Sequence, residues 1–227
     1  MIRAALLSFS VFLLNLVPGC DAAEWRQKMV VAVETPEGLK TGESVVEIRF
    51  SANRSESVKA LPGAKAGWKP RGEAVVVDLG ERGTLIALLK SAEGFAGDAG
   101  PNATFTFSET PAYAGSEEGI AAVLAEPLGV PVDVPRVAYP LIVTFDDISK
   151  PETIRQVDPD DLAASFGEGV RLKSLTLERT DEAVTDGSFP ELIRCNSPGN
   201  RCVPVNLKRP YDHPLRNVPN SAFRSFD

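Results

Sequence analysis

Residues 28–50 read KMVVAVETPEGLKTGESVVEIRF. The turn residues Pro36-Glu37-Gly38 separate two runs, 28–35 and 44–50, in which side chains of different character alternate along the chain. In the second run, apolar side chains take every other position and charged ones lie between them. A period of two is typical of a half-buried strand. The stretch therefore predicts a β-hairpin with a longish loop.

A second hairpin is predicted from residues 73–79 and 84–90, which flank Gly80-Glu81-Arg82-Gly83. A four-residue loop with glycine at both ends suits a tight connection. These two runs are almost continuously apolar, so we expect their strands to be more deeply buried than those of the first hairpin. A short alternating run at residues 103–108 predicts one more strand.

The next element is a helix at residues 116–126, which has Ser116 as its N-cap and is ended by Pro127. Residues 127–140 are rich in proline and form an extended connector. This connector is the best candidate for an internal boundary.

Strand patterns return at residues 141–145 and 153–157 and predict a third pair. A two-turn helix is then expected from Asp158, as N-cap, to Gly167, as its stop. Residues 170–178 change the parity of their apolar positions near Lys173-Ser174, which indicates a bulged strand.

The elements together predict a mainly β fold of antiparallel hairpins, sandwich-like, with two short helices; an α+β arrangement is the alternative. The composition supports a folded domain, because 43% of the 227 residues are hydrophobic while Gly and Pro number 18 each. Residues 20–187 are expected to form the β-rich globular domain.

The N-terminus, Met1 to Ala23, has one arginine, a short apolar run and small residues before Cys20. This pattern predicts a signal peptide over residues 1–19, because the apolar run is too short for a bilayer span. Val17-Pro18-Gly19-Cys20 resembles the bacterial lipoprotein box, although Pro18 is unusual in it. The resemblance implies cleavage before Cys20 and a lipid on its thiol; ordinary cleavage after Ala22 is the alternative.

A second resemblance lies in the segment that runs from Asp158-Pro159-Asp160-Asp161 through Phe166-Gly167 to Leu172. It is similar to a module of an uncharacterised family of exported bacterial proteins, over residues 139–185. The resemblance implies a folded unit and no particular activity.

Three cysteines are present, an odd number, and either form of N-terminal processing leaves two thiols, because Cys20 is lipidated or removed. The remaining Cys195 and Cys202 flank Pro198-Gly199, a turn signal, and are predicted to form a disulfide. A metal site is the rival interpretation, but this pair and the single histidine, His213, fall short of four ligands.

The C-terminal residues 188–227 differ in character from the rest of the chain. From residue 194 onward six basic residues oppose two acidic ones, and prolines forbid regular structure. The tail either wraps on the acidic body or forms a partner-binding arm with Phe223 and Phe226 as anchors.

Five aspartates are the candidate metal ligands: Asp146, Asp147, Asp158, Asp160 and Asp161. Carboxylates suit calcium or magnesium, yet the spacing lacks the pattern of a calcium loop, and three of the five have expected roles at a helix start. No catalytic residue is assigned, because His213 has no recognisable nucleophile beside it. No cofactor is predicted, since the chain has no phosphate-binding glycine motif. The net charge of −7 argues against nucleic acid or anionic lipid as the main partner.

The sequence thus predicts an exported protein of the bacterial cell envelope, facing the periplasm and anchored by a lipid on Cys20. A structural or interaction role is expected, with the membrane as one partner and a protein bound through the C-terminal tail as a possible second. Two alternatives stay open. The protein is soluble in the periplasm or secreted, or the acidic cluster serves a metal-dependent hydrolase or a calcium-binding protein.

Overall fold

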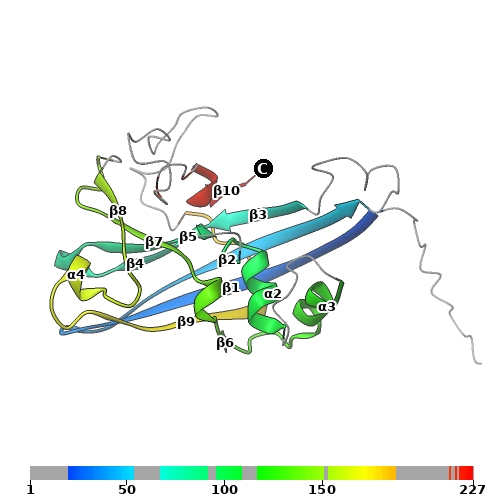
Figure 1. The fold of residues 1–227 in the computed structure, drawn as a ribbon, viewed down its shortest axis with the longest axis horizontal. Helices are drawn as coiled ribbons and strands as arrows, with labels where there is room; N and C mark the ends of the chain where they lie inside the picture. Colours follow the sequence, from blue (N-terminus) through cyan, green and yellow to red (C-terminus); the bar gives the residue numbers. More distant parts are fainter. Residues whose placement is uncertain are drawn as a thin grey trace, which may run out of the picture.

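The computed structural model describes residues 20–53, 67–91, 96–108, 117–150, 153–187, 215, 218 and 220–226. Its longest feature is the hairpin of β1 (Cys20–Thr35) and β2 (Gly38–Asn53), which crosses the molecule from end to end (Figure 1). The two strands pair antiparallel, with Thr35 opposite Gly38, so the turn is only two residues long. The predicted first hairpin is confirmed, but the longish loop is wrong, because residues 38–43 belong to β2 and lengthen the hairpin.

This hairpin is the centre of a six-stranded sheet in the order β10-β3-β2-β1-β9-β6. The four further strands are β3 (Gly67–Glu73), β6 (Val132–Asp133), β9 (Arg171–Thr180) and β10 (Arg224–Ser225). On β9 the register against β1 shifts by one residue at Lys173, because Ala32 pairs with Ser174 and Val33 with Leu172. The predicted bulge is therefore confirmed.

The second sheet has four strands in the order β4-β5-β7-β8. They are β4 (Val75–Asp78), β5 (Thr84–Ser91), β7 (Pro140–Phe145) and β8 (Ile154–Gln156). A single 3-10 turn, η1 (Gly80–Arg82), connects β4 to β5. Both antiparallel pairs that the sequence predicts here, β4 with β5 and β7 with β8, are confirmed.

The chain passes from the first sheet to the second with no intervening loop. At Gly72 the backbone has a φ of 146°, a value that favours glycine, and β3 turns away from β2 there. A β-carbon at Gly72 would lie 2.9 Å from the backbone oxygen of Val45. Thr185 then occupies the edge of β2 that β3 leaves, because its N–H donates to the Val45 oxygen at 3.0 Å. The Val45 N–H in turn donates to the Thr185 hydroxyl at 2.8 Å.

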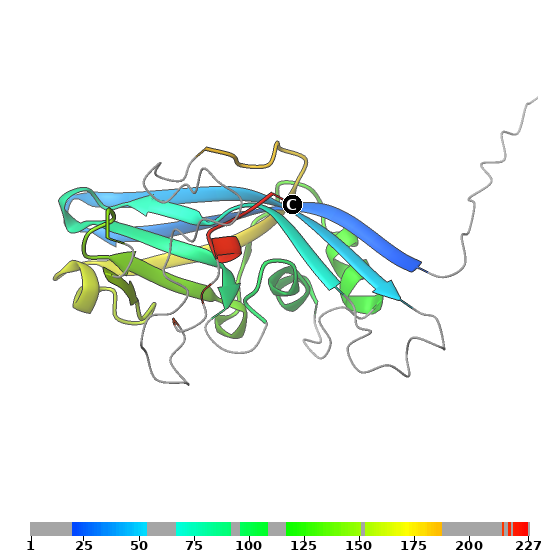
Figure 2. The same ribbon diagram turned by 90° about the horizontal axis from the view of Figure 1, so that it is seen from above.

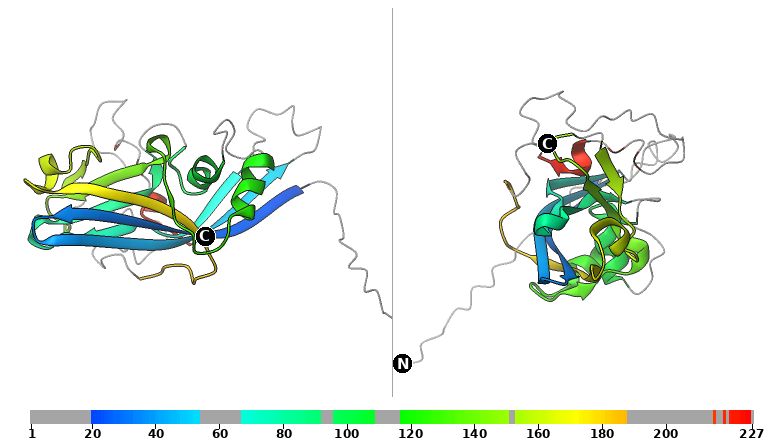
Figure 3. Two further views of the ribbon diagram at one scale, coloured as in Figure 1. Left: turned by 90° about the horizontal axis from the view of Figure 1, so that it is seen from below. Right: turned by 90° about the vertical axis from the view of Figure 1, so that its left-hand side faces the viewer.

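The main hydrophobic core lies between the two sheets. Inward-facing side chains of β1 and β2, such as Val31 and Ile48, meet those of the second sheet, such as Val77 and Leu85. Figure 3 shows, in its view along the long axis, both sheets surrounding this core. This two-layer arrangement of antiparallel sheets bears out the mainly β, sandwich-like prediction.

The outer face of the second sheet is also buried, under the C-terminal segment. Ile86 and Val143 on this face pack in a second cluster, to which the C-terminal segment contributes Leu215, Val218, Ala222 and Phe223. Figure 2 shows the C-terminal turn, in red, over this sheet. Burial on both faces explains why the sequence of these strands is almost continuously apolar.

The described residues include three short α-helices: α2 (Pro101–Phe107), α3 (Glu117–Ala125) and α4 (Ala163–Phe166). The predicted helix at 116–126 is confirmed by α3. The strand expected at residues 103–108 is wrong, because the structure has α2 there. Pro101 occupies its first turn, and Asn102 is buried against β1 through a hydrogen bond from the Gln27 side chain. Tertiary contacts therefore override the alternating pattern.

The helix predicted from Asp158 is shorter than expected. The Asp158 carboxylate accepts the N–H of Asp160 in a local turn, and α4 begins only at Ala163. The N-cap expected at Asp158 is therefore wrong. Asp161, which precedes the helix, instead accepts the N–H of Ala164 with its carboxylate at 3.2 Å. The predicted stop is confirmed, since Gly167 follows the helix with a φ of 93°.

The proline-rich connector, residues 127–140, contributes to the large sheet. Val132 of β6 pairs with Leu177 of β9, and a 3-10 turn, η2 (Arg136–Ala138), leads into β7. A last 3-10 turn, η6 (Asn220–Ala222), precedes β10. Every helix in the described part of the chain is too short or too polar to cross a bilayer.

Candidate functional site

The outer face of the large sheet carries charged side chains that are paired with one another. Lys28 of β1 lies 2.8 Å from Glu178 of β9 and 2.6 Å from Glu182, which follows β9. The hydrogen bonds to these two carboxylates raise the pKa of Lys28 above its usual range. This arrangement ties the end of β9 to the central hairpin. Because Lys28, Glu178 and Glu182 are paired with one another, we interpret them as a structural network and not as a binding site.

The five candidate aspartates are not gathered at one point. Three of them lie in separate ion pairs: Asp146 with Arg155 at 2.6 Å, Asp147 with Lys150 at 3.0 Å, and Asp160 with Arg136 at 3.1 Å. The other two, Asp158 and Asp161, accept backbone N–H groups around the start of α4. Among the described residues, no group of three or more His, Cys, Asp or Glu side chains is placed to hold a metal ion.

The predicted cysteine sites are only partly within the described residues. Cys20 is the first residue of β1 and pairs with Asn53 of β2. Cys195, Cys202 and His213 lie outside the described residues. The predicted disulfide therefore stays a prediction.

The two aromatic residues proposed as partner anchors have different surroundings. Phe223 is buried and its ring centroid lies 6.3 Å from that of Phe145, so this side chain is part of the core. Phe226 is half-buried, with the guanidinium carbon of Arg224 4.3 Å from its ring centroid. The end of the tail is thus docked on the domain at Phe223.

An ion pair fastens the turn end of the long hairpin. The Arg82 guanidinium donates to the Glu37 carboxylate at 2.8 Å and to the backbone oxygen of Phe166 at 3.1 Å. The bond from Arg82 is the main cause that lowers the pKa of Glu37 from 4.5 to about 2. A lowered pKa stabilises the fold above pH 4.5, and this contribution is lost as the pH falls through about 2.

We expect Arg82→Gln to move the Glu37 carboxyl titration upward toward 4.5, because the main cause of the shift is then removed. The measurement is an NMR titration of the Glu37 side-chain carboxyl. Lys40→Gln, close to the same turn, serves as the control and should leave the midpoint near 2. A Glu37 midpoint near 4.5 in the unaltered protein would contradict the ion pair.

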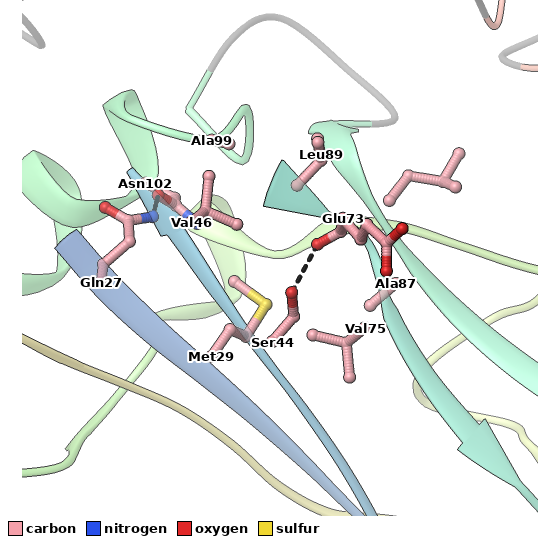
Figure 4. Close-up of a pocket in the computed structure, with 11 residues that line it drawn as sticks. Gln27, Met29, Ser44, Val46, Glu73, Val75, Ala87, Leu89, Ala99 and Asn102 are labelled. Carbon is pink, nitrogen blue, oxygen red and sulfur yellow. Dashed lines mark hydrogen bonds between the residues drawn. The ribbon is translucent and has the colours of Figure 1, made fainter. Parts of the chain in front are cut away.

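A small cavity lies in the main core between the two sheets (Figure 4). Apolar side chains such as Met29, Val46 and Val75 line most of it, and Gln27 and Asn102 lie together at one end. Its volume is about 20 Å³. A single water needs about 10–15 Å³, so the cavity has room for one water and is too small for a ligand.

The polar groups beside this cavity are bonded to one another. The Trp25 indole N–H donates to the Gln27 side-chain oxygen at 2.9 Å, and the Gln27 amide donates to Asn102 at 2.9 Å. Ser44 donates its hydroxyl to the backbone oxygen of Glu73 at 2.6 Å (Figure 4). Buried polar groups with partners position the elements that carry them, here α2 on β1 and β3 on β2.

A larger hollow opens at the surface and is here called the β3 groove. Its volume is about 430 Å³, within the roughly 300–1,000 Å³ of ligand-binding pockets. Its described lining comes from β3, from the end of β5, from the loop before α2 and from the C-terminal segment. These residues are Trp68, Lys69, Pro70, Leu89, Lys90, Asp98, Ser221, Ala222 and Ser225.

Trp68 is held in place from the core side of the β3 groove. Its ring meets Trp25 edge-on, with centroids 5.8 Å apart and planes at 82°, and Phe50 at 4.7 Å. A β-carbon at Gly100, where φ is 104°, would lie 2.7 Å from the Trp68 ring. Gly100 therefore permits both the backbone conformation and the close approach of the indole.

The charged groups of the β3 groove are two lysines and one aspartate. No ion pair or hydrogen bond to another described residue engages the ammonium of Lys69 or Lys90. The Asp98 carboxylate accepts the backbone N–H of Ser91 at 2.6 Å and its hydroxyl at 2.8 Å. The described lining thus has a formal charge of +1, whereas the whole chain carries −7.

The C-terminal wall of the groove is fixed by an ion pair between a partly exposed arginine and a buried carboxylate. Arg224 lies 2.9 Å from the carboxylate of Glu73, whose side chain is fully buried, and 2.6 Å from Asp186. The second oxygen of Glu73 accepts the N–H of Gly187, and the Ala74 N–H donates to the Phe223 oxygen at 2.8 Å. One carboxylate therefore joins β3, the segment after β9 and the C-terminal segment.

The sequence did not predict the β3 groove. Its wall is assembled from segments around residues 68, 89–98 and 221, which are well separated in the chain and have no common motif. Comparison with models of known protein families, with curated proteins and with solved structures finds no match for this chain. The β3 groove and the N-terminal sequence are therefore the features that bear on its function.

Proposed function

We propose that this chain is an exported, lipid-anchored protein of the bacterial cell envelope that acts by binding a partner molecule in the β3 groove. The observation that carries the binding role is the groove itself, which combines an apolar wall with two lysines that have no partner among the described residues. The anchor is supported by Val17-Pro18-Gly19-Cys20 and by the short apolar run before it.

The groups that line the groove suit binding better than covalent chemistry. Its described lining has no histidine or cysteine, and its carboxylate, Asp98, already accepts two hydrogen bonds from Ser91. Ammonium and hydroxyl groups around an apolar wall orient a ligand by charge and hydrogen bonds. The metal-dependent alternative has no such support, since Asp146, Asp147 and Asp160 each pair with a separate cation.

The position of Cys20 is compatible with an anchor. It is the first residue of β1, so a lipid on its thiol would join the membrane directly to the central hairpin. Acyl chains contribute about 0.8 kcal/mol per buried methylene, so the several chains of a bacterial lipoprotein anchor hold a protein stably on a bilayer.

We expect the mature protein from bacterial membranes to begin at Cys20 and to carry acyl groups on it. The measurement is mass spectrometry of the N-terminal peptide, together with separation of membrane and soluble fractions. Cys20→Ala should leave the protein unlipidated, whereas Ala22→Ser, which alters only the alternative cleavage site, should leave it lipidated. An unmodified N-terminus at Ala23 would show that the protein is exported without an anchor.

A further inference from the structure

We infer that the β3 groove takes an anionic amphiphile, a molecule with a phosphate-type headgroup and an apolar chain. This inference rests on the proposed role of the groove as the binding site and adds the chemical class of the ligand. The headgroup would lie at Lys69 and Lys90, and the chain would lie along the apolar wall.

The charge distribution favours an anion at this place. The two ammonium groups come from different sheets, Lys69 from β3 and Lys90 from β5, and line the same groove. With 31 acidic against 24 basic residues, the chain as a whole repels anions, so a local positive charge determines where an anion binds. The hydroxyls of Ser221 and Ser225 line the same space and can donate to a phosphate oxygen.

The remaining lining favours an apolar chain on the same ligand. Trp68, Pro70, Leu89 and Ala222 make up almost half of the described lining. Packing against Trp25, Phe50 and Gly100 fixes the Trp68 ring before a ligand arrives. A surface that is already ordered loses little side-chain entropy when it binds.

Leu89 lines the β3 groove and also the core cavity of about 20 Å³, which is drawn in Figure 4. It is the residue that the described linings of the two hollows share. The inner end of an apolar chain in the groove would therefore meet Leu89.

A peptide that adds a strand to the sheet is a poorer fit for the same place. Gly72 and Glu73 of β3 pair with β10, and the next residues along this edge include Pro70, which has no N–H to donate. Proline on an edge strand opposes the addition of a further strand. A compact ligand held by side chains does not need this donor.

The probe is dodecyl phosphate, added to the purified full chain below the concentration at which it forms micelles. Trp68 is one of only two tryptophans, so tryptophan fluorescence reports on the groove directly. We expect a saturable change in fluorescence and a rise in melting temperature. Dodecyl maltoside, which has the same chain and no charge, should bind at least tenfold more weakly. Equal binding of the two probes would overturn the inference, because the lysines would then have no role.

The variant for this test is Lys69→Gln/Lys90→Gln, which removes both ammonium groups and leaves polar side chains that are one atom shorter. It should lower the affinity for dodecyl phosphate at least tenfold and leave the melting temperature of the free protein unchanged. Lys40→Gln/Lys173→Gln is the matched control, because these lysines lie at the turn end of the long hairpin and the change in net charge is the same. A loss of affinity in both double variants would indicate general electrostatic attraction and overturn the inference.

Vesicles distinguish a membrane lipid from a soluble ligand. If phosphatidylglycerol vesicles change the Trp68 fluorescence and phosphatidylcholine vesicles do not, the ligand is a headgroup in the bilayer. If only free dodecyl phosphate changes the fluorescence, the ligand is a soluble amphiphile. Either result supports the inference, whereas no change with vesicles or with dodecyl phosphate overturns it.

The N-terminal mass is a separate measurement, so a missing lipid on Cys20 would refute the anchor without affecting the proposal for the groove.

Discussion

Phe223→Ala is expected to lower the free energy of unfolding by about 3–5 kcal/mol, the usual cost of removing a buried phenyl ring. The side chain is only 3% exposed and packs against Phe145 on the outer face of the second sheet. Truncation would leave a cavity beneath the C-terminal segment and expose Ile86 and Val143 to it. Urea unfolding followed by circular dichroism measures the effect.

Phe226→Ala is the matched control, three residues further along the chain. Phe226 is half-buried, and its main contact is the Arg224 guanidinium above its ring, an interaction of about 0.5–1 kcal/mol at an exposed site. Equal and small losses in the two variants would mean that the C-terminal segment is not docked in solution. That result would support the alternative interpretation of the C-terminal tail as a partner-binding arm.

Arg224→Ala is expected to have a similarly large effect, about 3–5 kcal/mol, because it removes the guanidinium that lies 2.9 Å from a fully buried carboxylate. The loss of stability arises because the Glu73 carboxylate stays buried, where water cannot solvate its charge once the guanidinium is gone. Arg155→Ala should lose no more than about 1 kcal/mol, since Arg155 and Asp146 form a pair that is exposed on both sides. Equilibrium unfolding in urea compares the two.

The pair can also be removed as a unit. Glu73→Gln/Arg224→Met takes away both charges, so it should be more stable than Arg224→Ala alone. A double variant less stable than the single one would show that the attraction between Glu73 and Arg224 is not the source of the loss.

Local patterns in the sequence were sufficient for the hairpins. The alternation over residues 28–50 predicted β1 and β2, and the near-continuous apolar runs predicted that β4 and β5 are more deeply buried. Even the bulge at Lys173 was visible, because an inserted residue reverses the parity of the apolar positions. These features depend on neighbours within a few residues, which the sequence displays directly.

Helix α2 was missed because its local pattern contradicts its structure. Thr104 to Phe107 alternates as a strand does, but Asn102 is bonded to Gln27, 75 residues away, and Gly100 must make room for Trp68. The available signal was Pro101 directly after a glycine, since proline is favoured in the first turn of a helix.

Around Asp158 the local signals predicted a longer helix than the structure contains. Residues suited to capping were present, but the Asp158 carboxylate accepts the N–H of Asp160 in a turn, and the helix begins only at Ala163.

The β3 groove could not have been predicted from the chain, because β3, the region from β5 to α2 and the C-terminal segment are brought together only by the fold. The five candidate aspartates show the reverse case, in which residues close in the sequence do not form one site. Asp146, Asp147 and Asp160 are close in the sequence, but the fold gives each of them its own cation. Proximity in sequence was therefore a poor guide to a site in both cases.

The direct passage from β3 through Ala74 into β4 has a consequence for how the molecule unfolds. One continuous stretch belongs to both sheets, and the C-terminal segment pairs with β3 through β10 while Phe223 packs on the second sheet. Neither sheet can open without breaking contacts of the other. We therefore expect one cooperative unit, in which the slowest-exchanging amide hydrogens of both sheets report the same global free energy of opening.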